Sequence, residues 1–104
     1  MKRYIIERDI AGVGGFSGGE LKQAAGTSNN ALAQLAPRVQ WIESFVAADK
    51  TFCHYLAEDE AAIHEHARLS GFPASRITEI GKKFDPVTAS AKAEEATSRL
   101  AVAS

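Results

Sequence analysis

One stretch of the chain, residues 51–73 with the sequence TFCHYLAEDEAAIHEHARLSGFP, holds its only cysteine and all three of its histidines. These residues are Cys53, His54, His64 and His66. A cysteine beside a histidine can become a nucleophile, and thiolate and imidazole groups are common ligands of transition metals. The stretch is therefore the first candidate for a metal site or a catalytic site.

The spacing of these residues excludes a chelate made by a single element. His64 and His66 are two residues apart in a predicted helix, so their side chains point about 200° from each other at roughly 100° per residue. A helical chelate needs two histidines four residues apart, and position 62 is alanine. Cys53 and His54 are neighbours in a predicted strand and point to opposite faces. A metal site must therefore combine different elements, or different subunits.

Each candidate also has a purely structural interpretation. His66 shares a helix face with Ala62 and Ile63, which fits a histidine at the edge of the core as well as a functional one. His64 lies on the solvated face of the same helix. Cys53 has aromatic neighbours and fits a buried structural cysteine, or a nucleophile if the fold brings a histidine to it. Carboxylates that can add metal ligands are Glu58, Asp59 and Glu65. Imidazole and carboxylate donors suit nickel, zinc or copper.

The elements that must position these groups follow the order β-α-β-β-α-β. Hydrophobic spacing, a Ser-Gly-Gly-Glu capping box at residues 17–20 and a Gly-Phe-Pro stop at residues 71–73 define the two helices. The predicted strands are residues 3–7, 39–47, 51–57 and 76–84, and the predicted helices are residues 18–36 and 60–70. This order is typical of an α+β, ferredoxin-like domain with an antiparallel sheet and two helices on one face. The predicted domain covers residues 1–87, and residues 88–104 form a polar, alanine-rich tail, weakly helical or disordered.

Composition excludes several classes of function. A net charge of −1 and a pI near 6.3 leave no basic face for nucleic acid. No apolar run approaches the roughly 20 residues of a membrane span, and the N-terminus lacks a signal-peptide core. A single cysteine cannot form an internal disulfide, which fits a reducing cytoplasm. The loop GVGG at residues 12–15 lacks the spacing of a phosphate-binding loop and predicts a flexible connection or tight turns.

The predicted hairpin is apolar on both of its faces. Val39, Trp41 and Phe45 are expected on one face of its first strand, and Ile42 and Val46 on the other. A sheet with helices on one face and water on the other should alternate apolar and polar residues. We therefore expect the open face to pack against a second copy of the chain in a twofold-symmetric homodimer.

Three segments resemble a family of small bacterial proteins that was long classified as a domain of unknown function and is now called nickel-binding. They are KRYIIERDIAGVGG, WIESFVAADKTFCHYLA and EAAIHEHARLSGFPASRITEI, within about residues 2–88. The resemblance implies a ferredoxin-like fold, a homodimer, and surface nickel sites that sequester excess nickel. Positions that match the family include Cys53, Tyr55 and His66. The family commonly has an aliphatic residue in place of His54 and an arginine in place of His64.

Three hypotheses follow. The first is a cytoplasmic, non-enzymatic nickel-binding homodimer whose ligands come from His66, His54, His64 and Cys53. The second is a small dimeric enzyme or ligand-binding protein, in which a cleft between sheet and helices uses Glu43, Cys53, Tyr55 and His66 on a small molecule. The third is a dimeric scaffold whose buried polar residues serve only its stability.

Overall fold

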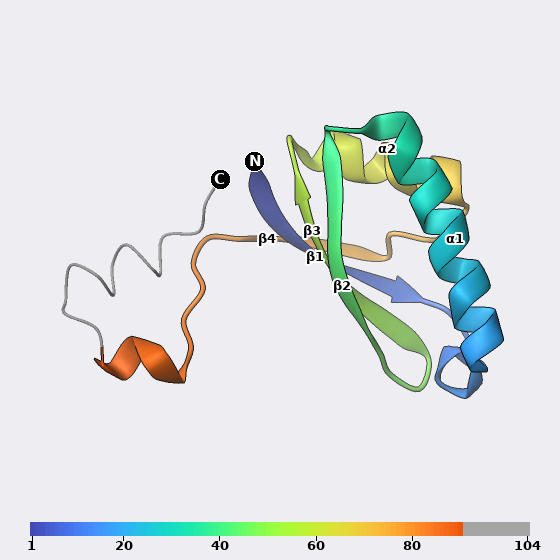
Figure 1. Cartoon of the computed structure of the whole chain (residues 1–104), viewed down its shortest axis with the longest axis horizontal. Coiled ribbons are helices and arrows are strands. Elements are labelled where there is room, and N and C mark those ends of the chain that lie inside the picture. The colour runs from blue at the N-terminus through green and yellow to red at the C-terminus, as the bar shows by residue number, and fades with distance from the viewer. Residues whose placement is uncertain (91–104) are drawn as a thin grey trace.

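The computed structural model describes residues 1–90, which fold into one four-stranded antiparallel sheet with two helices packed on one face (Figure 1). The strands lie in the order β2-β3-β1-β4. The elements are β1 (Lys2–Asp9), η1 (Val13–Gly15), α1 (Gly18–Leu35), β2 (Val39–Val46), β3 (Lys50–Ala57), α2 (Glu60–Ser70), β4 (Arg76–Ile80) and η2 (Pro86–Ser90). This confirms the predicted α+β, ferredoxin-like fold.

Both helices begin and end where their sequence signals predict. Ser17 caps α1: its hydroxyl accepts from the amide of Glu20, and the Glu20 carboxylate accepts from the amide of Ser17. Asp59 caps α2 by accepting from the amide of Ala62. Gly71 ends α2 in the left-handed conformation, with φ of 79°, which costs glycine little.

The two central strands direct alternate side chains into the core beneath the helices. Residues of β1 and β3 pair in antiparallel register, with Tyr4 opposite Tyr55 and Ile6 opposite Cys53. These four side chains are all buried. The next inward position of β1 is Arg8, which is only 3% exposed. A charged residue therefore occupies a position that strand alternation reserves for the core.

A bulge in β2 changes which of its side chains face the helices. Pairing with β3 shifts register between Trp41 and Glu43, so one extra residue enters β2. The expectations that Phe45 shares a face with Trp41 and that Val46 lies on the opposite face are therefore wrong, since Val46 lines the same pocket as Trp41. Ser44 contacts Trp41 on the helix side, while Phe45 is 61% exposed on the open face.

The last strand is shorter than predicted. β4 ends at Ile80, which pairs with Arg3 of β1. The two strands are antiparallel and β1 begins at Lys2, so β1 offers little further pairing beyond Ile80. Residues 81–90 then extend away from the sheet and end in η2 (Figure 1). The predicted tail starts within η2, and its residues 91–104 lie outside the described part of the chain. No helix within residues 1–90 is long and apolar enough to cross a membrane.

The glycine-rich loop after β1 packs against the hairpin turn between β2 and β3. The amide of Gly14 donates to the carbonyl oxygen of Ala48 at 2.9 Å. A Cβ atom on Gly14 would lie 2.8 Å from the Ala47 carbonyl oxygen and 2.9 Å from the Ala48 Cα atom. The backbone of this loop therefore packs so closely against the hairpin turn that position 14 has no room for a side chain.

We expect Gly14→Ala to lower the free energy of unfolding by about 1–3 kcal/mol, because backbone atoms must move to admit the methyl group. Gly15→Ala is the matched control, since a Cβ atom there meets nothing within 4 Å. It should change stability by no more than about 0.5 kcal/mol. Chemical denaturation of both variants measures the difference, and equal stabilities would contradict the close approach.

Candidate functional site

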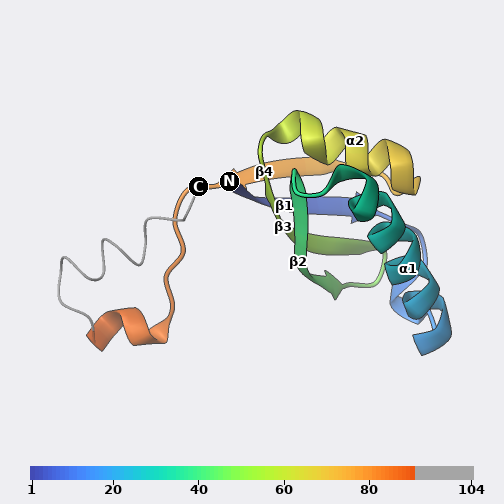
Figure 2. The ribbon, with the colours of Figure 1, turned by 45° about the horizontal axis from the view of Figure 1, so that its top comes forward.

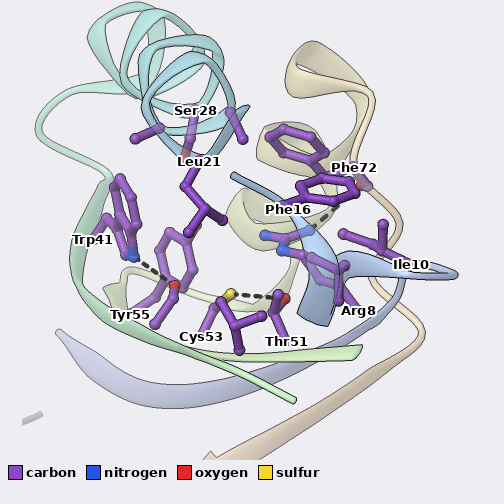
Figure 3. Close-up of a pocket in the computed structure, with 15 residues that line it drawn as sticks. Arg8, Ile10, Phe16, Leu21, Ser28, Trp41, Thr51, Cys53, Tyr55 and Phe72 are labelled. Carbon is purple, nitrogen blue, oxygen red and sulfur yellow. Dashed lines mark hydrogen bonds between the residues drawn. The ribbon is translucent and has the colours of Figure 1, made fainter. Parts of the chain in front are cut away.

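A pocket of about 400 Å³ opens between α1 and the sheet, at the end of the sandwich where β1 leaves it (Figure 3). Its walls are mostly apolar and come from α1, three strands and the loops after β1 and α2. They consist of Arg8, Ile10, Val13, Phe16, Leu21, Ala24, Ala25, Ser28, Trp41, Ser44, Val46, Thr51, Cys53, Tyr55 and Phe72. This volume lies within the usual range for sites that hold small organic molecules.

Arg8 is the charged residue in this wall. Its Nη1 donates to the carbonyl oxygens of Phe72 at 3.4 Å and Pro73 at 2.9 Å. Its guanidinium carbon lies 5.8 Å from the centre of the Tyr55 ring, a cation–π contact. Its Nη2 lies 3.4 Å from Nδ1 of His66. All of these partners are electrically neutral groups.

His66 lies behind the pocket wall, 1% exposed, and contacts three of the wall residues. Its Nε2 is 3.1 Å from the Ser28 hydroxyl, and its ring centre is 5.3 Å from that of Tyr55. A guanidinium can only donate, so Nδ1 of His66 accepts from Arg8 and Nε2–H donates to Ser28. Burial, and then the charge of Arg8, lower the pKa of His66 to about 4, although the contact with Ser28 opposes them. The imidazole is therefore neutral near pH 7.

Cys53 and Tyr55 line the pocket, as the cleft hypothesis expects. The Cys53 sulfur lies 3.4 Å from the Thr51 hydroxyl and is buried. No contact between Cys53 and a base is present among residues 1–90, so nothing described there activates it as a nucleophile. Burial raises the pKa of Tyr55, and the nearby charge of Arg8 partly offsets this shift.

The other predicted residues lie elsewhere. Glu43 and His54 are neighbours on the open face of the sheet, with His54 Nδ1 3.6 Å from Glu43 Oε2, so Glu43 is not part of the pocket. Nε2 of His54 also contacts Arg3 Nη1 at 2.6 Å. His64 lies on the exposed face of α2, 3.6 Å from Glu60 Oε1, one helical turn earlier. The structure thus separates the three histidines into three environments.

The fit of a metal ion differs between these environments. Within residues 1–90 no group of three or more His, Cys, Asp and Glu side chains gathers to hold an ion. A cation does not fit at His66, because both ring nitrogens already have partners and one partner is positively charged. The surface pairs Glu43–His54 and Glu60–His64 each offer one imidazole and one carboxylate, ligand types that nickel accepts.

Sequence reasoning did not single out Arg8, although part of the signal was present. Tyr4, Ile6 and Arg8 are two residues apart, but the predicted first strand ended at residue 7, whereas β1 continues to Asp9 and so places all three on one face. Ser28 is buried on the inward face of α1. Its role as partner of His66 depends on packing between helices, which the spacing along one helix does not reveal.

Comparison with known proteins identifies relatives of this chain. A family model described as "Nickel responsive protein SCO4226-like" matches residues 4–80. The crystal structure of SCO4226 from Streptomyces coelicolor A3(2) is similar in fold, with a TM-score of 0.67 and 14% sequence identity. The alignment covers 79% of this chain and 99% of that one. No curated protein sequence matches.

We expect the low pKa of His66 to make stability depend on pH. The unfolded chain protonates this histidine near pH 6.5 and the folded chain only near pH 4, so the unfolded state binds more protons between these values. The neutral imidazole makes its full contribution to the free energy of unfolding above about pH 6.5. This contribution falls by up to about 3 kcal/mol as the pH drops to 4.

Urea denaturation across this pH range tests the expectation. His66→Gln keeps a donor and an acceptor without titrating, so its stability should fall less steeply than that of the wild type. His64→Gln is the matched control, because it makes the same substitution at an exposed position of the same helix. If His66→Gln and the wild type show the same slope, the assignment of a buried neutral imidazole is wrong.

Proposed function

We infer that this chain, which belongs to the family described as "Nickel responsive protein SCO4226-like", binds nickel at its surface as a non-enzymatic protein. The observation that carries this proposal is the family match over residues 4–80. The proposed role is to take up excess nickel in the cytoplasm, a compartment that suits a chain with one unpaired cysteine. The geometry of the histidines supports some ligands over others.

The pair Glu60 and His64 is the most accessible candidate for the ion. The side chains are 60% and 62% exposed, so solvent and metal reach both of them. Their nearest nitrogen and oxygen atoms are 3.6 Å apart on consecutive turns of α2, and small rotations bring both onto one ion. Water would complete the coordination, which predicts moderate rather than tight binding.

The pair Glu43 and His54 is a second candidate, but Arg3 competes with the ion for His54. The side chain of His54 is only 14% exposed, and Arg3 contacts its Nε2 atom. Binding of nickel there requires this guanidinium to move, since a cation beside the ion is repelled. We therefore propose Glu60–His64 as the first site to fill and Glu43–His54 as the weaker one.

Calorimetric titration of tag-free, metal-free protein with nickel tests the proposal. We expect His64→Ala to weaken the first binding event by roughly tenfold or more, because half of the protein ligands are lost. His66→Gln is the control and should bind nickel as the wild type does. Absence of nickel uptake, or uptake unchanged by both His64→Ala and His54→Ala, would contradict surface binding by these pairs.

We also propose that two copies associate through the open face of the sheet. Both helices lie on the other face (Figure 2). Large apolar side chains are therefore left uncovered on the open face. Ile42, Phe45 and Phe52 are 48%, 61% and 37% exposed. Patches of this kind on a soluble domain commonly mark an interface. A twofold axis through this face would also bring two Glu43–His54 pairs to one interface, which would add ligands for nickel.

Replacing Phe45 tests this association. We expect Phe45→Lys to convert the dimer to a monomer while changing the free energy of unfolding of the monomer by no more than about 0.5 kcal/mol, because this side chain contributes little to the core. Phe84→Lys makes the same change at an exposed position beyond the sheet and should remain dimeric. Light scattering after size exclusion measures both masses, and a monomeric wild type would contradict the proposal.

A further inference from the structure

We propose that the pocket between α1 and the sheet binds a small organic carboxylate with an apolar body, its carboxylate paired with Arg8. This proposal does not rest on nickel binding, since the pocket and the surface histidines are separate. It depends on three features of the pocket wall: a buried positive charge without a counter-ion, hydroxyl groups that can still donate, and an apolar interior that reaches the surface.

The charge of Arg8 has no counter-ion within the part of the chain that the structure describes. No ion pair involves it in residues 1–90, although the residue is only 3% exposed. Two carbonyl oxygens, the face of Tyr55 and a neutral imidazole stabilise it only partly. Burying a cation without an opposite charge costs free energy, which an anion in the pocket would recover. Figure 3 shows the guanidinium directed inward from the pocket wall.

Three hydroxyl groups of the wall already have one partner each. The Ser44 hydroxyl accepts from the indole nitrogen of Trp41 at 2.9 Å, and Ser28 accepts from His66. Thr51 is paired with Cys53. Because Ser44 and Ser28 accept in these contacts, each keeps its own O–H group to donate, which suits an acceptor such as a carboxylate. Among residues 1–90, Arg8 is the only charged residue in the lining of this pocket. A ligand with a single negative group therefore matches the wall best.

The remainder of the pocket suits a hydrocarbon body. Leu21 and Val46 line it and are 39% and 45% exposed, so apolar surface continues from the interior to the mouth. Trp41 and Phe16 add flat apolar walls (Figure 3). Burial of apolar surface contributes to affinity roughly in proportion to the area removed from water, which makes such a body the main source of affinity.

The neutral state of His66 agrees with this choice of ligand. Burial and the charge of Arg8 lower its pKa, so a second positive charge is already disfavoured in this region. A ligand amine would meet the same repulsion and desolvation. A carboxylate would relieve the repulsion instead.

Four matched compounds test the proposal on the wild-type protein. Phenylbutanoate is the probe, phenylbutanamide is its neutral counterpart, phenylbutylamine is its cationic counterpart, and acetate carries the head group alone. Trp41 is the chain's only tryptophan and lines the pocket, so its fluorescence reports occupancy. We expect phenylbutanoate to bind at least about tenfold more tightly than the amide, and the amine and acetate to bind more weakly still.

Two substitutions with a matched control locate the site. Ala25 lines the pocket from α1, so Ala25→Phe should fill it and weaken phenylbutanoate binding at least about tenfold. Ala33→Phe makes the same change at an exposed position of α1 and should leave binding unchanged. Arg8→Met should remove the preference for the carboxylate over the amide.

The comparison of ligands on the wild type needs no variant, so the proposal remains testable even if Arg8→Met does not fold. Equal affinity for phenylbutanoate and phenylbutanamide would overturn it, because Arg8 would then not select charge. No change in Trp41 fluorescence together with no heat of binding for phenylbutanoate would also overturn it. Loss of nickel binding with retained phenylbutanoate binding would reject only the nickel proposal.

Discussion

The buried guanidinium of Arg8 organises the functional end of this protein. It occupies the third inward position of β1, after Tyr4 and Ile6, where an apolar residue would complete the core. Its hydrogen bonds hold the carbonyl groups of Phe72 and Pro73, and thereby tie the end of α2 to β1. A buried cation must find partners for its donors, so these contacts are constraints on the loop as well as on the arginine.

The charge of Arg8 also determines which ligands the interior can accept: it disfavours a metal cation and favours an anion. Next to Arg8, His66 stays neutral and hydrogen-bonded, which makes the interior a poor place for a metal cation. The pairs proposed to bind nickel, Glu60–His64 and Glu43–His54, therefore lie outside this interior. The interior, with its apolar walls and one uncompensated charge, suits an anion. Nickel and an organic carboxylate are thus proposed for separate regions of one small domain.

Local signals in the sequence predicted most of the fold because they act within a few residues. Ser17, Glu20, Asp59 and Gly71 fixed the limits of both helices through hydrogen bonds and backbone conformations that each sequence motif specifies. The bulge near Trp41 was not predicted, because one extra residue in a strand leaves no mark in its composition. It reversed the expected face of Phe45.

The candidate site was less predictable because its contacts join distant segments. The sequence predicted that His64 and His66 face different ways, and α2 places them so. The second hypothesis placed Cys53, Tyr55 and His66 near one cleft. Cys53 and Tyr55 line the pocket, and His66 lies behind its wall. Glu43 was expected there as well and lies on the opposite face of the sheet. Pairing of His66 with Ser28 and Arg8 depends on packing over 38 and 58 residues of separation.

The most direct test of this account is the pKa of His66, measured by NMR of its imidazole in the wild type and in Arg8→Met. We expect a pKa of about 4 in the wild type, because the ring is buried beside a positive charge. We expect a higher pKa for His66 in the variant, where the charge is gone and burial remains. A wild-type pKa near the ordinary value of 6.5, or one that Arg8→Met leaves unchanged, would contradict the claim that Arg8 is an uncompensated charge.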